Sequence, residues 1–307
     1  MKKRVKALVL LSGGLDSILA VKLLLEQGIE VEAINFRTNF CGPSKARPAA
    51  KMLDVPLREV DIRQDFLAVL KKPKYGYGAG LNPCIDCHAL MLKKASEIMR
   101  AEGFDFVATG EVLGERPMSQ HKRALKIVET EAGLEGYLLR PLSAKLLEPT
   151  VLEKDGWVDR KKLLDISGRS RKRQMELAAR YHIKNYPTPA GGCALTEKGF
   201  GERLRELMKN KPDFDVNDID LIKIGRHFFS GGAQIILGRN QEENEILESA
   251  VGEKDTLIKP QNFIGPAALL RGKKNGEAEI SKAKELIIKF SKKATVPEDL
   301  NFKINRS

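Results

Sequence analysis

The residues near the start of the chain that could do chemistry are the six of Ser12-Gly13-Gly14-Leu15-Asp16-Ser17. They follow an apolar run, Val5 to Leu11, and precede a segment with helical leucine spacing, Ile18 to Glu26. Glycines allow the backbone to approach a ligand, and the free N–H groups of a helix start attract anions. The pattern therefore predicts a phosphate loop between a buried strand and a helix.

The side chains of this loop suggest which phosphate compound it binds. Ser12 and Ser17 are expected to add hydroxyl donors, and Asp16 would repel an anion unless it holds Mg²⁺. The chain lacks a G-x-x-x-x-G-K-[ST] pattern, which argues against a Walker-type loop. The alternative is a tight strand-to-helix turn with a capping serine.

Three of the four cysteines have the spacing of a metal or redox site. Cys84 and Cys87 form C-x-x-C at a predicted helix start, where the helix dipole is expected to lower the thiol pKa, and Cys193 is a natural third ligand. Three cysteines without an obvious fourth suit a 4Fe-4S cluster with one open iron. The alternatives are zinc with Cys41 or His88 as the fourth ligand, a dithiol without metal, and inert cysteines. Apart from the zinc alternative, Cys41 is expected to be structural.

Basic residues dominate the chain and gather in one segment. Lys and Arg number 53 against 41 Asp and Glu, a formal charge of +12, which favours a polyanionic partner such as nucleic acid. Between Asp159 and Arg173 we expect phosphate contacts from Arg169, Arg171, Lys172 and Arg173. The alternative is a solvated helix face.

These residues need a scaffold of alternating strands and helices. We expect strands at 31–36, 57–62, 104–109 and 134–142, and helices at 47–53, 87–101, 159–166 and 171–181. This order predicts an α/β fold with a doubly wound parallel sheet, whose ligands bind at the carboxyl ends of the strands. Thr109 and Gly110, at one such end, are further candidates for nucleotide binding.

The pattern of the sequence changes near residue 198, from alternating apolar runs and helices to short strand signals, and we expect a domain boundary there. Residues 1–198 would form the catalytic domain, and 199–307 a smaller α+β domain with a hairpin around Ser230-Gly231-Gly232 and helices at 242–250 and 277–290. The loop from Tyr186 to Thr196, which carries Cys193, is expected to be shaped by its prolines and glycines. No apolar stretch approaches the length of a membrane span, so a cytoplasmic location and no membrane partner are expected.

The motifs resemble a known enzyme class. S-G-G-L-D-S after a strand resembles the pyrophosphate loop of the adenine-nucleotide alpha-hydrolase-like ATP pyrophosphatases, which implies that a substrate is adenylated and pyrophosphate released. Asn82 to Cys87 is similar to the N-P-x-x-x-C segment of tRNA-specific 2-thiouridylases, in which the last cysteine is catalytic. By this resemblance, Cys87 and Cys193 take the places of the catalytic pair.

Cys84 departs from the thiouridylase pattern. The resulting three-cysteine set is similar to that of iron-sulfur-dependent tRNA thiolation enzymes. In the second domain, Ile224 to Phe228 and Ile236 to Asn244 resemble the RNA-binding module of fibronectin-binding-protein-related ribosome-associated factors.

Together the motifs predict an ATP-dependent sulfurtransferase that replaces a uridine carbonyl oxygen of tRNA by sulfur. The expected cofactors are ATP, Mg²⁺ and a 4Fe-4S cluster, and the expected partners are tRNA and a sulfur donor, sulfide or a desulfurase-derived persulfide. A persulfide relay between Cys87 and Cys193, a ligase acting on a small acid and a non-enzymatic RNA-binding protein are the alternatives. The sequence leaves open whether the chain forms a homodimer.

Overall fold

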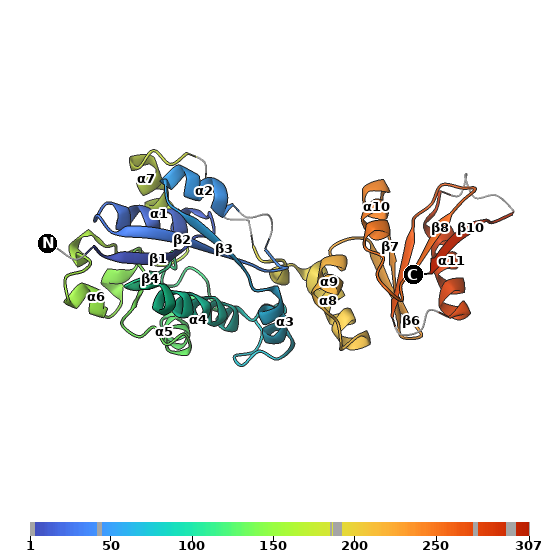
Figure 1. The fold of residues 1–307 in the computed structure, drawn as a ribbon, viewed down its shortest axis with the longest axis horizontal. Helices are drawn as coiled ribbons and strands as arrows, with labels where there is room; N and C mark the ends of the chain where they lie inside the picture. Colours follow the sequence, from blue (N-terminus) through green and yellow to red (C-terminus); the bar gives the residue numbers. More distant parts are fainter. Residues whose placement is uncertain are drawn as a thin grey trace. The chain divides into compact units, whose positions relative to one another are not determined.

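The computed structural model describes residues 4–41, 45–184, 186, 192–272, 276–292 and 299–306. They form two compact units, Met1–Glu197 and Lys198–Ser307. Figure 1 shows the first unit in blue to yellow-green and the second in yellow to red.

The first unit is built on a parallel sheet with the strand order β3-β2-β1-β4-β5. The strands are β1 (Lys6–Leu10), β2 (Glu30–Arg37), β3 (Leu57–Asp61), β4 (Phe106–Ala108) and β5 (Leu138–Leu139). The α-helices are α1 (Leu15–Leu25), α2 (Ala46–Leu53), α3 (Arg63–Lys71), α4 (Cys84–Glu102), α5 (Lys122–Glu131), α6 (Val151–Lys154) and α7 (Lys172–Arg180). Short 3-10 turns are η1 (Ala144–Leu146), η2 (Arg160–Lys162) and η3 (Ala194–Thr196).

Both faces of this sheet are covered by helices, as Figure 1 shows. Apolar residues of α1, α2 and α7 pack on one face of the sheet. Those of α4 and α5 pack on the other. A strand buried on both faces has no polar alternation, which is why Ala7, Leu8 and Val9 could be recognised as a central strand.

The second unit is an antiparallel sheet with the order β10-β8-β9-β7-β6. Its elements are α8 (Lys198–Asn210), α9 (Val216–Leu221), β6 (Arg226–Ser230), β7 (Ala233–Leu237), α10 (Gln241–Ser249), β8 (Thr256–Pro260), β9 (Ala268–Gly272), α11 (Glu277–Phe290) and β10 (Phe302–Arg306). Helix α11 packs on one face, and Leu247 of α10 joins the cluster on the other. The predicted fold class, a doubly wound parallel sheet plus a smaller α+β domain, is confirmed.

Two predicted elements of the first unit are wrong. The strand expected at 134–142 has only two paired residues, because Gly136 has a φ of +80° that breaks the extended backbone before them. The helix expected at 159–166 is only the 3-10 turn η2. Beyond it the chain is extended, since the backbone N–H groups of Leu164 and Ile166 donate to the carbonyls of Pro141 and Leu142.

Helices α3 and α5 were not predicted. Of the loop expected at 186–196, residues 187–191 lie outside the described residues, and its end forms the 3-10 turn η3. No helix in the described ranges is both long and apolar enough to cross a bilayer.

Candidate functional site

The phosphate loop lies where the strand order of the parallel sheet reverses. The chain runs from β1 outward to β3 and then returns to place β4 on the other side of β1. The loops that follow β1 and β4 diverge at this point, which is where open α/β sheets bind ligands. Gly110, after β4, lies so close to the loop after β1 that a Cβ there would be 2.5 Å from the Ser17 amide nitrogen.

The phosphate loop presents free backbone donors. Gly13 has a φ of +79°, and Gly14 is the N-cap of α1 without any side-chain cap. The hydroxyls of Ser12 and Ser17 face each other at 3.2 Å, and Ser17 donates to the Gly14 carbonyl at 2.8 Å. The loop thus holds its own shape through its serines and leaves the first N–H groups of α1 for an anion.

Two carboxylates lie beside this loop. Burial raises the pKa of Asp16, whose Oδ1 atom is buried without a hydrogen-bond partner in the described structure. Burial also raises the pKa of Glu115, and the neighbouring Asp16 charge raises it further. A pair of crowded carboxylate oxygens next to a phosphate loop fits Mg²⁺ in the chemistry of its donors. Glu115 was not predicted, because it comes from the loop after β4 and has no motif of its own.

Helix α7 brings a cation and an amide to the same carboxylates. The Arg171 charge lowers the pKa of Asp16 and of Glu115, against the larger effect of burial. Gln174 is fully buried, and its amide lies near Asp16 without a well-formed hydrogen bond. This approach is fixed by the Gly168 amide, which donates to the Leu113 carbonyl in the loop after β4.

The four basic residues predicted to contact RNA are therefore divided. Arg171 lies with the phosphate loop. Arg173 forms a 2.6 Å ion pair with Asp165, while Arg169 and Lys172 are exposed. The sequence treated these residues as one group because they are contiguous, but a helix start directs neighbouring side chains to different sides.

A buried ionic network closes the end of β4. Glu111 accepts hydrogen bonds from Thr109 at 3.0 Å and from Arg140 at 3.0 Å, and its Oε1 atom lies 2.8 Å from Nδ1 of His88. Burial alone would raise the pKa of Glu111, but Arg140 and His88 hold it at about 2. The Thr109 hydroxyl is thus committed to Glu111. His88, which follows Cys87, ties the cysteine helix to the strand that faces the phosphate loop.

The C-x-x-C pair lies at the start of α4, which begins three residues earlier than predicted. The Cys87 amide donates to the Pro83 carbonyl, which begins the helix at Cys84. Asn82 donates through Nδ2 to the Cys84 sulfur at 3.1 Å and to the Met118 sulfur at 3.6 Å. The loop that precedes the helix is thereby bound to the first cysteine.

The fold brings Cys193 and Cys41 to this pair. The Ala194 amide donates to the Phe40 carbonyl at 2.9 Å, so the residue that follows Cys193 is hydrogen-bonded to the residue that precedes Cys41. Burial raises the pKa of Cys87 well above its usual range, and the Cys193, Cys41 and Cys84 thiols raise it further. Burial likewise raises the pKa of Cys193 to about 12, with Cys41 and Cys84 adding to it.

The predicted lowering of the thiol pKa by the helix dipole is therefore wrong for Cys87, because burial and three like-charged neighbours outweigh the dipole. Clustered thiols of this kind fit a metal or cluster in donor chemistry, since metal binding supplies the charge that holds thiolates together. In geometry, no three His, Cys, Asp or Glu side chains in the part of the chain that the structure describes are arranged as a ready metal site.

Comparison with known protein families gives two matches to separate parts of the chain. Residues 3–146 match the family described as thiamine biosynthesis protein (ThiI). Residues 225–306 match the NFACT protein RNA binding domain.

Several curated relatives are tRNA-specific 2-thiouridylases named MnmA. The protein of Caldicellulosiruptor saccharolyticus is 32% identical over 174 residues, covering 49% of this chain and 43% of its own. That of Syntrophotalea carbinolica is 37% identical over 127 residues, covering 36% of each chain. The chain thus spans less than half the length of these relatives. Their names and the two family matches confirm the predicted resemblance to tRNA thiolation enzymes.

Solved structures that are similar include a 4-thiouridine synthetase in complex with RNA and bound ATP. It is 20% identical, with a TM-score of 0.41, and the match covers 71% of this chain and 52% of that one.

Proposed function

We propose that this chain is an ATP-dependent tRNA thiolation enzyme that adenylates a uridine carbonyl oxygen and replaces it by sulfur. One observation carries the proposal. A phosphate loop lies at the start of α1 and a group of cysteines lies around the start of α4, and the His88–Glu111 contact connects α4 to the segment that follows β4. Residues 1–197 would be the catalytic unit and 198–307 an RNA-binding unit, and the two family matches fall on these two parts.

The first step is activation of the base. The carbonyl oxygen of uridine attacks the α-phosphorus of ATP, a new O–P bond forms, and the bond to pyrophosphate breaks. The free N–H groups at the start of α1 stabilise the phosphate charge, and Arg171 lies where it would add to them. Asp16 and Glu115 are the residues that would hold Mg²⁺, which supplies charge neutralisation for the departing pyrophosphate.

The second step is sulfur insertion. A sulfur nucleophile adds to the activated carbon, the C–O bond breaks, and AMP leaves with the former carbonyl oxygen. Cys84, Cys87 and Cys193 are the residues that would hold a 4Fe-4S cluster, which when bound supplies an iron that is open to hydrosulfide. The sulfur donor would be sulfide or a persulfide from a cysteine desulfurase.

The alternative for this step is a persulfide relay without a cluster. Terminal sulfur on Cys87 would attack the activated carbon, and the Cys193 thiolate would then break the resulting S–S bond to release the thiolated base and leave a Cys87–Cys193 disulfide. An external dithiol would reduce that disulfide for the next turnover. Because burial raises the pKa of both thiols, this relay also requires a group that takes the proton when the Cys193 thiolate forms.

Mass spectrometry of nucleosides from tRNA incubated with the enzyme, ATP and sulfide tests the function. We expect a thiouridine to appear only with ATP, together with AMP and pyrophosphate in equal amounts. Pyrophosphate release that tRNA does not stimulate would instead indicate a ligase acting on a small molecule.

Cys84→Ala separates the two forms of the second step. In the cluster form it abolishes both iron binding after anaerobic reconstitution and thiolation. In the relay form thiolation continues, because Cys84 takes no part in it. An iron-free wild-type protein that still thiolates tRNA would contradict the cluster.

A further inference from the structure

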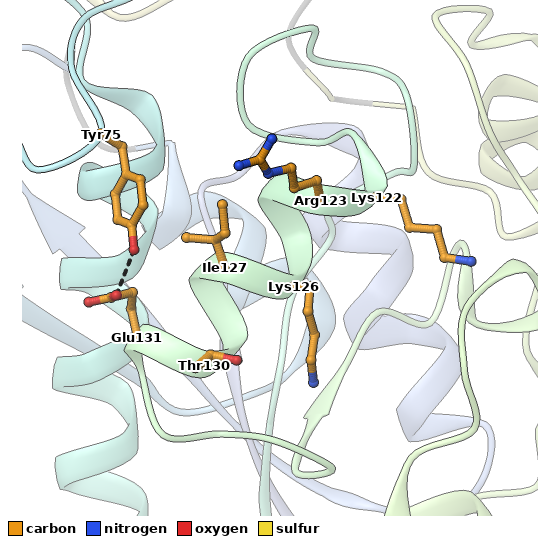
Figure 2. Close-up of a pocket in the computed structure, with 7 residues that line it drawn as sticks. All are labelled: Tyr75, Lys122, Arg123, Lys126, Ile127, Thr130 and Glu131. Atoms are coloured by element: carbon orange, nitrogen blue, oxygen red, sulfur yellow. Dashed lines mark hydrogen bonds between the residues drawn. The ribbon is translucent and has the colours of Figure 1, made fainter.

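An open groove lies beside α5 on the first unit, outside the site described above. Its volume is about 610 Å³, and its lining includes Tyr75 from the loop after α3 and Lys122, Arg123, Lys126 and Glu131 from α5. Figure 2 shows the three basic side chains projecting from one helix, with the Tyr75 hydroxyl directed at Glu131 across the groove.

The cations of this groove stand where a helix does not favour them. Lys122 and Arg123 are the first two residues of α5, and no acidic residue occupies its first turn. The N-terminus of a helix carries positive partial charge, so two cations there reduce helix stability, whereas acidic residues would increase it. Residues that break a local rule of this kind are expected where a function requires them.

The groove keeps a net positive charge. Glu131, an acidic residue of its lining, already accepts hydrogen bonds from Lys74 and Tyr75 at 2.6 Å each. Lys126 is exposed and lies 3.7 Å from Glu129, a mostly buried carboxylate that also pairs with Arg140. Lys122 and Arg123 have no ion-pair partner within the described ranges, so their charges face solvent.

Hydrogen bonds connect the elements that carry the groove to the segment around the C-x-x-C pair. The Asp86 carboxylate accepts hydrogen bonds from the amides of Lys74 and Tyr75, at 2.7 and 3.0 Å. On the other side, Met118 precedes α5 by four residues and accepts the hydrogen bond from Asn82, which also donates to Cys84. The groove is thus connected to the cysteine segment through Tyr75, which lines it, and through Met118, which lies four residues before α5.

The distribution of charge supports an anionic occupant of the first unit. Residues 1–197 contain 33 Lys and Arg against 24 Asp and Glu, so they carry +9 of the total of +12. The unit that matches an RNA-binding domain therefore accounts for only +3. Most of the attraction for a polyanion lies on the unit that holds the cysteines.

We propose that the groove formed by Tyr75, Lys122, Arg123 and Lys126 binds the phosphodiester backbone of the RNA substrate and leads it to the cysteines. This inference rests on the proposed function for the identity of the RNA. Contacts between cations and phosphates position a nucleic acid without reading its sequence, which fits a groove whose polar groups are mainly charges.

Binding of tRNA to the full chain, measured by fluorescence anisotropy at several salt concentrations, tests the groove. We compare the double variant Lys122→Glu, Arg123→Glu with a control of equal charge, Lys51→Glu, Lys154→Glu, whose lysines are exposed on α2 and α6. Glutamates at the start of α5 favour the helix, so the groove variant is expected to fold as well as the wild type. Circular dichroism and a measurement of ATP affinity will check that the groove variant is folded.

We expect the groove variant to lose about tenfold or more in tRNA affinity, and its plot of log K against log salt to flatten by about two units, while the control shifts much less. Equal affinities and slopes for the two variants would overturn the proposal. So would unchanged tRNA affinity together with lost sulfur transfer from a donor protein, because the groove would then be a docking site for an acidic protein.

Measuring tRNA affinity distinguishes a failure of this proposal from a failure of the proposed function. Affinity is measured without turnover, so a wild-type protein that binds RNA through the groove but never thiolates it supports the groove and contradicts the function. A wild-type protein that thiolates tRNA with the groove variant unimpaired contradicts the groove alone.

Discussion

At the scale of single residues, the buried position of the Asp16 carboxylate lowers the stability of the folded state. Burial raises its pKa, and one oxygen has no hydrogen-bond partner in the described structure. An ordinary turn-forming residue would be solvated or capped. A buried, unpartnered carboxylate beside free helix N–H groups is instead what a site for a cation and a phosphate requires.

Replacement of Asp16 by Asn tests this reading through activity and stability together. We expect thiolation and pyrophosphate release to fall by about 100-fold or more, since a preorganised charge contact is lost. The folded pKa of Asp16 is raised above its ordinary value of 3.8, so ionisation destabilises the native state as the pH rises through that range. Asp16→Asn removes this effect, and its melting temperature at pH 7 should equal or exceed that of the wild type.

Asp155→Asn, at an exposed position of the same unit, is the matched control for activity. Full thiolation by Asp16→Asn would contradict the assignment of the loop.

Cys41 poses a second question at this scale. It is exposed, its sulfur accepts a 3.6 Å hydrogen bond from Thr38, and its thiol raises the pKa of Cys87 and Cys193. In a three-cysteine cluster Cys41 is a neighbour, not a ligand. We therefore expect Cys41→Ser to keep its iron after anaerobic reconstitution, while Cys193→Ser loses it, as read from the visible absorption of the cluster. Loss of iron from both variants would make Cys41 a fourth ligand.

Most of the residues of this site that the sequence predicted belong to local motifs; Cys193 and Arg171 were predicted without one, and Cys41 only as an alternative zinc ligand. S-G-G-L-D-S and C-x-x-C are local, so their chemistry can be recognised without a fold. Glu115 was not predicted, and the position of Cys41 beside the other cysteines could not be, because β4 and the Phe40–Ala194 hydrogen bond bring distant segments together. Spacing along the chain carries no information on such contacts, although a carboxylate shortly after Thr109-Gly110 could have been a candidate.

At the scale of elements, the contact between the starts of α1 and α2 is fixed by a glycine. A Cβ at Gly13 would lie 2.2 Å from the Lys45 carbonyl oxygen, which is backbone and cannot turn away. Gly103, which ends α4, also has a positive φ, but nothing lies within 4 Å of its Cβ position. Comparing the two glycines therefore separates the cost of a left-handed backbone from the cost of a steric overlap.

We expect Gly103→Ala to cost about 1–2 kcal/mol of unfolding free energy, from the left-handed backbone alone. Gly13→Ala should cost a further ~1–3 kcal/mol, because the overlap must be relieved by moving the loop, and should also weaken ATP binding. Urea denaturation and ATP titration of both variants measure these effects. Equal stability losses with unchanged ATP affinity would show that the loop tolerates the collision.

The network at the end of β4 predicts a dependence on pH. Arg140 and Glu111 are both buried, and a broken buried pair leaves an uncompensated charge. Glu111→Gln should cost about 3–5 kcal/mol of unfolding free energy at pH 7. Since the folded pKa of about 2 lies below the ordinary value of 4.5, the stability from this carboxylate is present above pH 4.5 and is lost as the pH falls towards 2.

The variant should therefore lose less stability than the wild type between pH 5 and 3 in urea denaturation. Glu102→Gln is the control, because Glu102 pairs with Arg58 at the surface and is expected to contribute less than about 1 kcal/mol. A parallel pH dependence of Glu111→Gln and wild type would contradict this assignment.

At the scale of the whole molecule, the order of strands and helices made the fold predictable, since alternation of apolar runs and amphipathic segments leaves little choice but a parallel sheet. The segments that were predicted wrongly are those whose backbone partners are distant. Residues 159–166 have a helical pattern, yet their amides pair with the segment around Pro141. Helix α5 was missed because its apolar face is only three buried residues, Ala124, Leu125 and Val128.

Each unit of the chain has its own apolar clusters, which predicts that the first can be studied alone. The cysteines and the phosphate loop all lie within residues 1–197, as does the Phe40–Ala194 hydrogen bond. We expect this fragment to unfold cooperatively and to retain ATP binding at wild-type affinity. Because it carries +9 of the charge, it should also retain most of the salt dependence of tRNA binding, although with weaker affinity than the full chain.

Titration of the fragment and of the full chain with the same tRNA, at matched salt concentrations, measures the division of binding between the units. The fragment carrying Lys122→Glu and Arg123→Glu serves as the control, and its salt dependence should fall further. If the folded fragment binds no tRNA while residues 198–307 retain the full salt dependence, the electrostatic attraction lies in the second unit, and the excess charge of the first has another purpose.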